Sequence, residues 1–292
     1  MKNKNILYSV MLHTGGLYSD KFYIKQQFKH CLHYTPNLSH PQTFQEKLQW
    51  LKLYDRKAVY STMVDKYEAK DFIQKKIGSE YIIPTLGVYN QSAEIDYDLL
   101  PKQFVMKTTH DSGTVVVCKD KSKLDIEKTN RYLDKRLSRK YYLIEREWPY
   151  KNVQPRIIVE ELIGQPGEDL RDYKFFCFDG QPKLMFIVSN RFGEGGHKAD
   201  FFDMEGNPVG VYQPGYENSP VPPQIPPCFE QMKELASVLS TGVPHLRVDF
   251  YYTNNQIYVG ELTFSDSGGY VPFIPDKYNR ILGDWIKLPI DE

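Results

Sequence analysis

Two carboxylates near the end of the chain stand where they could hold a metal ion together. The runs 246–252 and 257–264 are rich in β-branched and aromatic residues and flank a polar turn, so they predict an antiparallel hairpin. Asp249 and Glu261 lie at equal distances from the middle of this turn and are expected nearly opposite each other. Such a pair is costly unless one carboxyl is protonated or a cation lies between them, and these oxygen ligands suit Mg²⁺. The alternative is a pair of carboxylates that points to solvent.

A lysine at a strand end is the second candidate. Residues 104–107 predict a strand, 108–113 a small polar loop and 114–118 a returning strand. Lys107 at the end of the first strand could join the backbone N–H groups of the loop around a polyphosphate. The chain lacks G-x-x-x-x-G-K, so this is no Walker A loop. The alternative is an ordinary hairpin with a surface lysine.

Two further segments carry cations. The glycine-rich connection 191–198 contains Arg191 and Lys198 and suits a mobile loop over a ligand. Residues 125–139 predict a basic helix, whose charged face is either solvated or attractive to an acidic substrate. The side chains expected to point inward are Ile126, Leu133 and Leu137, and those expected outward are Lys128, Arg131, Lys135, Arg136 and Arg139.

Two other clusters fit known motifs poorly. Asp96 and Asp98 match the D-x-D metal motif of glycosyltransferases, but no nucleotide-binding βαβ pattern surrounds them, so we interpret them as a turn or helix cap. The histidines and cysteine at 30–40 match no usual zinc spacing.

Composition narrows the class of protein. Lys+Arg and Asp+Glu both number 37 among 292 residues, so nothing favours bulk binding of nucleic acid. Four widely spaced cysteines predict reduced thiols. The start of the chain lacks the length and cleavage site of a signal peptide, and no run approaches the ~20 apolar residues of a spanning helix. We expect a cytoplasmic protein without a transmembrane segment; a peripheral position at the inner face of the membrane is the alternative.

The elements that must position these residues are mixed in type. About the first 60 residues predict helices, notably one over 44–54 behind a capping box at Thr43 and Glu46. A second helix is expected over 63–76, ended by Gly78. The remaining expected elements are a strand over 81–89 broken by Pro84, strands 157–164, 173–178 and 183–188, a turn at Asp179–Gly180, a proline-rich loop 208–227 and a helix 229–239.

The order of these segments resembles the ATP-grasp superfamily. The segments that carry the resemblance are Asp65–Lys66 with Ile83–Pro84, 104–113, 159–163, and 247–249 with Glu261. More narrowly, the sequence is similar to the TupA-like branch, named for teichuronopeptide synthesis. That similarity covers roughly residues 40 to 285 and lies in 43–50, 65–67, 172–180 and 260–264, with Lys107, His110, Ser112 and Gly113.

The resemblance implies an α+β fold of the ATP-grasp type, in which two α+β lobes clasp ATP between antiparallel sheets. A helical N-terminal segment would occupy residues 1–62 and the ATP-grasp domain 63–292. The small lobe would span about 85–160, and the large lobe about 161–292 together with the helix at 63–77.

The resemblance also implies the residues that contact the nucleotide. Lys107 would contact the α- and β-phosphates, and the loop of His110, Ser112 and Gly113 would close over them. Asp172 would bind the ribose, with Glu168 and Asp169 as the alternatives. The other nucleotide-binding residues would be Lys66, Lys174 and the adenine-reading hinge of Glu160, Glu161, Leu162 and Ile163.

The resemblance also implies residues that bind the metal ion and take part in catalysis, most of them in the hairpin. Asp249 and Glu261, with the weaker ligand Thr263, would hold Mg²⁺ between the phosphates. Arg247 would stabilise the oxyanion that forms when an amine attacks an acyl phosphate, and Arg191 or Lys198 would reach the γ-phosphate.

Three positions depart from the pattern. Thr263 stands where ligases of the superfamily commonly have asparagine, and Asp111 stands in the phosphate loop where the branch usually has glycine. A carboxylate beside phosphate is unfavourable unless it points away or meets a cation. The residues before Asp65 are too few and too helical for the Rossmann-like domain that often precedes this fold.

The activity implied is that of an ATP-dependent carboxylate–amine ligase. Its cofactors would be ATP and Mg²⁺, and its partners an amino acid or other small amine and a uronic-acid or amino-sugar precursor of a bacterial capsule or cell-wall polysaccharide. The alternatives are a glycosyltransferase of polysaccharide synthesis that uses Asp96 and Asp98, a non-catalytic nucleotide-binding partner in capsule assembly, and an ATP-grasp kinase.

Overall fold

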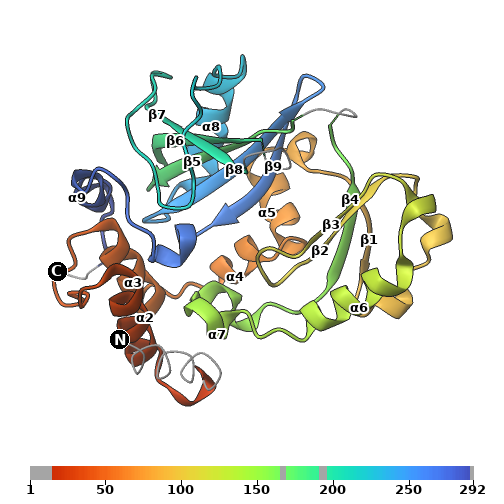
Figure 1. The fold of residues 1–292 in the computed structure, drawn as a ribbon, viewed down its shortest axis with the longest axis horizontal. Coiled ribbons are helices and arrows are strands. Elements are labelled where there is room, and N and C mark those ends of the chain that lie inside the picture. The colour runs from red at the N-terminus through yellow and green to blue at the C-terminus, as the bar shows by residue number, and fades with distance from the viewer. Residues whose placement is uncertain (1–14, 165–168, 191–195, 290–292) are drawn as a thin grey trace.

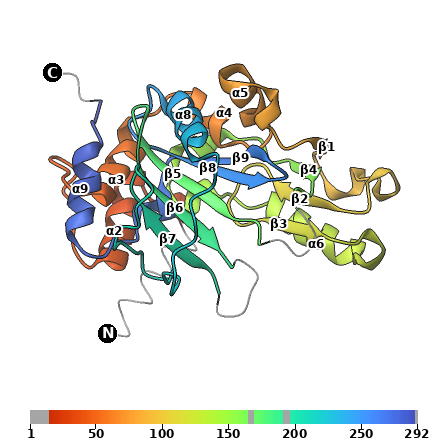
Figure 2. The same cartoon turned by 90° about the horizontal axis from the view of Figure 1, so that it is seen from above.

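Strands with inward-facing apolar residues build two antiparallel sheets in the computed structural model, which describes residues 15–164, 169–190 and 196–289 (Figures 1 and 2). The smaller sheet has the order β1-β4-β2-β3 and the larger the order β7-β6-β5-β8-β9. The strands are β1 (Thr85–Tyr89), β2 (Phe104–Thr108), β3 (Val115–Cys118), β4 (Ile157–Glu161), β5 (Asp172–Phe178), β6 (Gln181–Ser189), β7 (Lys198–Phe202), β8 (Leu246–Thr253) and β9 (Gln256–Thr263).

The helices lie around the two sheets (Figure 1). None of those described is long and apolar enough to cross a membrane. They are α2 (Asp20–Leu32), α3 (Phe44–Tyr54), α4 (Val59–Val64), α5 (Glu68–Ile77), α6 (Ile126–Leu137), α7 (Tyr142–Glu145), α8 (Phe229–Ser240) and α9 (Lys277–Trp285). Short 3₁₀ helices include Tyr97–Leu99, Trp148–Asn152 and Asp266–Gly269.

Two predicted hairpins are confirmed. Asn254 and Asn255 have φ of 52° and 59° between β8 and β9, and Asp179 and Gly180 have φ of 46° and 77° between β5 and β6. Positive φ at both central residues gives a turn whose twist matches that of the strands it joins, which is why asparagine and glycine occur there.

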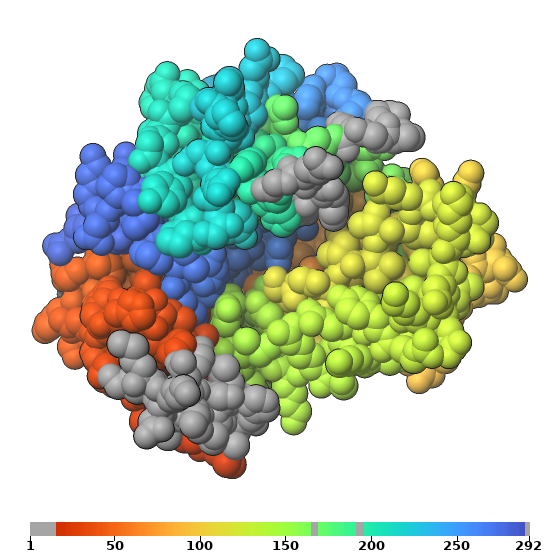
Figure 3. All heavy atoms as spheres, viewed as in Figure 1, coloured from red at the N-terminus to blue at the C-terminus, as the bar shows by residue number. Residues whose placement is uncertain are grey.

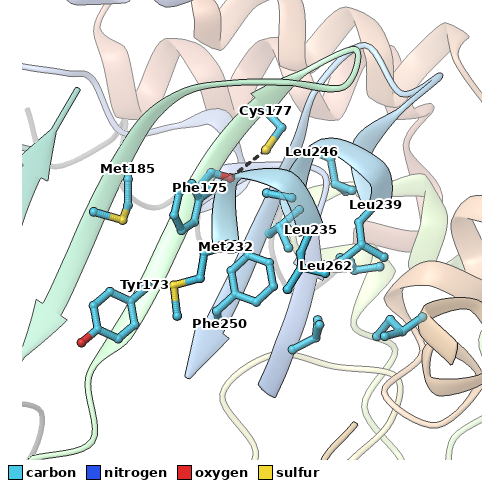
Figure 4. Packing of buried hydrophobic residues seen from close by; sticks show 14 of the residues in the cluster. Tyr173, Phe175, Cys177, Met185, Met232, Leu235, Leu239, Leu246, Phe250 and Leu262 are labelled. Atoms are coloured by element: carbon cyan, nitrogen blue, oxygen red, sulfur yellow. Dashed lines mark hydrogen bonds between the residues drawn. The ribbon is translucent and has the colours of Figure 1, made fainter. Parts of the chain in front are cut away.

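One face of the large sheet is an apolar core. Alternate residues of β5 and β8, such as Phe175 and Phe250, pack against α8 through Met232 and Leu235 (Figure 4). The alternation leaves Lys174, Arg247, Asp249 and Tyr251 on the opposite face, because successive side chains of a strand point to opposite sides.

That opposite face is partly covered by α3 and α9. Phe44 and Leu48 of α3 join a second core with Phe176 and Phe273. The capping box predicted at the start of α3 is present, with Thr43 accepting from the backbone of Glu46. Helix α3 therefore packs directly on the large sheet. The part of this face that α3 and α9 leave uncovered is available to a ligand.

In the small sheet, too, alternate side chains point to an apolar core on one face and away from it on the other. Phe104 and Met106 of β2 and Val159 of β4 pack with Leu133 of α6 in a third core. The intervening Lys107 and Glu160 lie on the other face. Each sheet therefore presents charged residues on the face that its own core does not use.

Several local predictions are wrong. The helix expected over 63–76 is interrupted at Asp65, whose extended backbone lets its carboxylate accept from the N–H groups of Tyr67 and Glu68 and start α5 anew. The strand expected over 81–89 begins only after Pro84. Ile126, expected to point inward, is 41% exposed because it is the first residue of α6.

Candidate active site

A cleft of about 690 Å³ separates the two sheets. Figure 3 shows a hollow between the small lobe and the strands of the large lobe. Lys66 and Lys107 line the cleft from one side, and Arg247, Asp249 and Glu261 line it from the other. The structure therefore brings together in one cavity the cations and the carboxylates that the sequence placed far apart along the chain.

The hairpin pairs Asp249 directly with Glu261, as predicted. Asp249 is 2% exposed, and both of its oxygens are occupied: Arg247 contacts them at 2.7 Å and 2.8 Å, and Lys174 pairs with the second. Burial alone would raise the pKa of Asp249, but the charges of Arg247 and Lys174 outweigh it and hold the pKa below its usual range. From the sequence we expected a metal ion to offset the repulsion between the two carboxylates. In the structure, Arg247 and Lys174 already offset the charge of Asp249.

Glu261 differs from Asp249 in having no fixed partner. Its carboxylate is partly exposed in the cleft and makes no hydrogen bond or ion pair with any described residue. No group of three or more His, Cys, Asp and Glu side chains suited to a metal occurs in the described parts of the chain. Oxygen donors nevertheless fit Mg²⁺, which is commonly held by one or two carboxylates and completed by phosphate and water. Glu261 is the donor here that is free to bind first.

Arg247 is held from three sides. Its guanidinium contacts Asp266 at 2.5 Å and the hydroxyl of Thr263 at 3.2 Å, in addition to Asp249. Burial opposes the charge, but Asp249 and Asp266 outweigh it and raise the pKa of Arg247. Thr263 therefore accepts a hydrogen bond from Arg247, and its hydroxyl would have to be shared with any metal ion.

The wall of the cleft that carries Lys107 contains a buried ion triad. The ammonium groups of Lys70 and Lys107 contact the two oxygens of Glu160 at 2.5 Å and 2.6 Å. Burial would raise the pKa of Glu160, but the two lysines outweigh it and lower the pKa. Lys66 donates to the backbone carbonyl of Asp111 at 2.5 Å, which ties it to the neighbouring loop.

Asp111 turns away from the cleft. Its carboxylate is fully buried, contacts Arg136 at 2.9 Å and accepts from the hydroxyls of Thr108 and Thr114. Arg136 was expected to point outward and instead binds this carboxylate and the carbonyl of Ser112. The unfavourable position of Asp111 beside a phosphate is thus avoided, and the carboxylate anchors the loop from behind.

The predicted phosphate-loop residues differ in whether they line the cleft. Ser112 and Gly113 are exposed and line the cleft, and Gly113 has a φ of 80° that favours glycine. His110 is 4% exposed, does not line the cleft, and bonds through its ring to the carbonyl of Arg139 at 3.1 Å. Burial lowers the pKa of His110, which keeps the ring neutral.

The other predicted residues are spread along the lobe junction. Glu161 is exposed, Leu162 and Ile163 are partly buried, and Asp172 is buried at the start of β5. Lys198 begins β7 and is not part of a loop; its ammonium contacts Glu217 at 2.6 Å. Arg191 lies outside the described residues.

Several residues in or beside the cleft were missed in the sequence. Asp266 holds Arg247, Lys70 shares Glu160 with Lys107, and Glu145 and Glu147 line the cleft from a segment between α6 and β4. The sequence gives no motif for these contacts because each joins residues far apart in the chain. Lys70 alone offered a signal, since it stands one helical turn after Lys66.

The D-x-D motif has a structural role. Asp96 accepts from the backbone of Asp98 and caps the 3₁₀ helix Tyr97–Leu99, as we interpreted from the sequence. Both aspartates are exposed and neither lines the cleft.

Comparison with protein families decides the class. The family described as TupA-like ATPgrasp matches residues 46–287. The chain belongs to the TupA-like ATP-grasp family. Its fold is accordingly the α+β ATP-grasp fold, and the resemblance noted in the sequence is confirmed. No curated protein matched the chain.

Solved structures similar to this family member include D-alanine–D-alanine ligases and an ATP-grasp ligase. D-alanine–D-alanine ligase from Helicobacter pylori is 14% identical, with 84% of this chain and 69% of that chain covered and a TM-score of 0.44. The enzyme of the same name from Bacillus anthracis is 16% identical, with 77% and 66% covered and a TM-score of 0.43. The ATP-grasp ligase PsnB, complexed with minimal precursor, Mg and ADP, is 11% identical, with 83% and 66% covered and a TM-score of 0.42. The chain thus spans about two thirds of the length of these proteins.

Proposed function

We propose that the protein is an ATP-dependent carboxylate–amine ligase that works through an acyl phosphate. The observation that carries this proposal is the cleft itself, in which Lys66 and Lys107 face Arg247, Asp249 and Glu261. Cations on one wall suit the phosphates of ATP, and carboxylates on the other suit the Mg²⁺ that accompanies them. Membership of the ATP-grasp family supports the same assignment.

Each side chain has a role in this proposal. Lys107, Lys66 and the Ser112–Gly113 loop bind phosphates, and the hinge residues 160–163 with Asp172 and Lys174 bind the rest of the nucleotide. Glu261 would hold Mg²⁺ together with Asp249, whose oxygens the ion would share with Arg247 and Lys174, and the ion would neutralise charge during transfer. Arg247, fixed by Asp266, donates to the oxyanion that forms on the attacked carbonyl. Lys198 or Arg191 supplies the cation for the γ-phosphate.

We further propose that one substrate is a uronic-acid or amino-sugar unit of a bacterial capsule or cell-wall polysaccharide precursor and the other an amino acid. The TupA-like family, named for teichuronopeptide synthesis, supports this choice. A cytoplasmic enzyme, free or peripheral to the inner face of the membrane, would meet both substrates and ATP.

The test is an ADP-release screen of amino acids against uronic-acid and amino-sugar acceptors. We expect ADP to appear only when an amine and a carboxylate partner are both present. ADP release with a stable phosphorylated product would instead identify a kinase, and ATP binding without ADP in any mixture would identify a non-catalytic partner. Glycosyl transfer that is lost in Asp96→Asn with Asp98→Asn and kept in Glu261→Gln would identify a glycosyltransferase.

A further inference from the structure

One wall of the cleft is formed by a segment that the roles above do not use. Residues 141–150 lie between α6 and β4 and include α7 and the start of the 3₁₀ helix Trp148–Asn152. Four of its side chains line the cleft: Tyr141, Glu145, Glu147 and Tyr150. This wall is acidic and aromatic, whereas the phosphate-binding wall is basic.

Glu145 reaches the turn that holds Arg247. A Cβ atom on Gly268 would lie 2.2 Å from one oxygen of Glu145, so the carboxylate lies directly against this glycine. Asp266, in the same turn, contacts Arg247 at 2.5 Å. The acidic wall is therefore adjacent to the group that we assign to the reacting carbonyl.

Glu147 lies beside Glu145 and is 4% exposed. It accepts a hydrogen bond of 3.4 Å from the hydroxyl of Tyr141. The buried cation nearby, Lys52, donates to the backbone carbonyls of Glu145 and Gly268 at 3.0 Å and 2.5 Å and makes no ion pair with either carboxylate. Two acidic groups thus line the cleft without a cation bonded to them.

Tyr150 provides an independent sign that a ligand belongs here. Its side chain is 6% exposed and lines the cleft, yet its hydroxyl has no hydrogen-bond partner among the described residues. Its ring packs edge-on against Tyr141, with centroids 4.8 Å apart. The hydroxyl of this nearly buried side chain is therefore free to make a hydrogen bond with a polar group bound in the cleft.

We propose that Glu145, Glu147 and Tyr150 form the subsite for the amino group of the amine substrate, which arrives there as an ammonium ion. This deepens the ligase assignment and rests on it. Carboxylates form charge-assisted hydrogen bonds with an ammonium group, and the faces of aromatic rings attract cations. The same subsite would reject a substrate that carries a hydroxyl in place of the amine.

The subsite also completes the proton balance of the ligase step. The nitrogen lone pair forms the new C–N bond to the acyl carbon, the bond from that carbon to the phosphate oxygen breaks, and phosphate leaves with its electron pair. Two protons leave the nitrogen: the ammonium ion gives the first to the carboxylate of Glu147, which frees the lone pair, and the departing phosphate takes the second as the amide forms. Burial raises the pKa of Glu147 to about 8 against the opposing charge of Lys52, so this group can exchange a proton near neutral pH.

The test is a binding measurement that needs no turnover. Glycinamide and glycolamide differ only in an ammonium group and a hydroxyl, and each is titrated calorimetrically into the full chain loaded with Mg²⁺ and a non-hydrolysable ATP analogue. We expect the protein to bind glycinamide more tightly than glycolamide. The double variant Glu145→Gln with Glu147→Gln should lower the affinity for glycinamide by about 10-fold or more and leave the affinity for glycolamide unchanged. Glu127→Gln, at an exposed carboxylate of α6, is the matched control and should change neither.

Results with the unaltered protein and with the double variant could each overturn the subsite. One is equal affinity of the unaltered protein for the two probes, or no detectable binding of glycinamide. The other is an unchanged preference for glycinamide in the double variant. If the double variant fails to fold, Tyr150→Phe decides instead, because it removes only the hydroxyl and should weaken glycinamide several-fold. A failed ADP-release screen would contradict the ligase assignment. ADP release in that screen without a preference for glycinamide over glycolamide would contradict the subsite alone.

Discussion

Glu261→Gln should remove the chemistry of the cleft and leave the stability of the fold unchanged. Glu261 is partly exposed and makes no hydrogen bond or ion pair with any described residue, so removing its charge breaks no direct contact of the folded state. We expect the free energy of unfolding to change by no more than about 0.5 kcal/mol. If the carboxylate binds Mg²⁺, turnover should fall by about 100-fold or more, because a bound metal contributes several kcal/mol to the transition state.

Asp249→Asn is the informative comparison, because it lies opposite Glu261 and differs in its contacts. Asp249 is 2% exposed and neutralises Lys174 and Arg247. Removing one partner of a buried ion pair typically costs about 3–5 kcal/mol. Arg247 keeps Asp266, so we expect the lower end of that range, about 3 kcal/mol, and a clear fall in the melting temperature.

The assay joins thermal unfolding to Mg²⁺-dependent ADP release for both variants, with Glu127→Gln as the surface control. The expected pattern is loss of turnover in both variants and loss of stability in Asp249→Asn alone. Equal destabilisation of the two variants would refute the contrast drawn from their contacts. Mg²⁺-dependent turnover that survives in Glu261→Gln would refute the metal role of this hairpin.

Three further outcomes follow from contacts in the small lobe and the turn after β9. Asp111→Asn should cost about 2–4 kcal/mol in urea unfolding and raise the KM for ATP, since the buried carboxylate anchors the phosphate loop. Glu160→Gln should be less stable than the native chain at pH 7, and the difference should shrink as pH falls below about 4.5, because a lowered pKa stabilises only while the group is ionised. Gly268→Ala should lower stability and turnover, because its φ is 61° and the new Cβ would meet Glu145, whereas Gly210→Ala, with no atom within 4 Å, should be neutral.

Each of these outcomes has a clear contrary. An unchanged KM for ATP in Asp111→Asn would contradict the proposal that the buried carboxylate anchors the phosphate loop. A stability difference for Glu160→Gln that is constant from pH 7 to pH 3 would contradict the lysine triad. A native-like Gly268→Ala would contradict the close approach of the carboxylate to the turn.

The hairpin shows what local sequence can predict. A turn of two asparagines sets the register of β8 and β9 from Thr253 to Phe250, and a bulge at Gly260 then shifts the pairing by one residue, which brings Asp249 opposite Glu261. The same reasoning found the capping box of α3 and the Asp179–Gly180 turn. Each of these depends on residues within about one hairpin or one helical turn of each other.

The surroundings of the hairpin could not be predicted in this way. Lys174 reaches Asp249 from the neighbouring strand β5, and Arg136 reaches Asp111 from α6. Both are charged residues on amphipathic elements, for which solvent is the default expectation. Only the packing of distant segments turned them into buried partners, so the charge balance of the cleft appears in the structure and not in any motif.

The contacts of Lys52 restrict how the two lobes can move. This residue of α3 packs with the large lobe, and its single ammonium holds one carbonyl from Gly268 and one from Glu145. Gln49, one turn earlier, also holds the carbonyls of Gly268 and Gly269. Separation of these two segments would break hydrogen bonds to a buried cation, so Lys52 holds the cleft closed at this end.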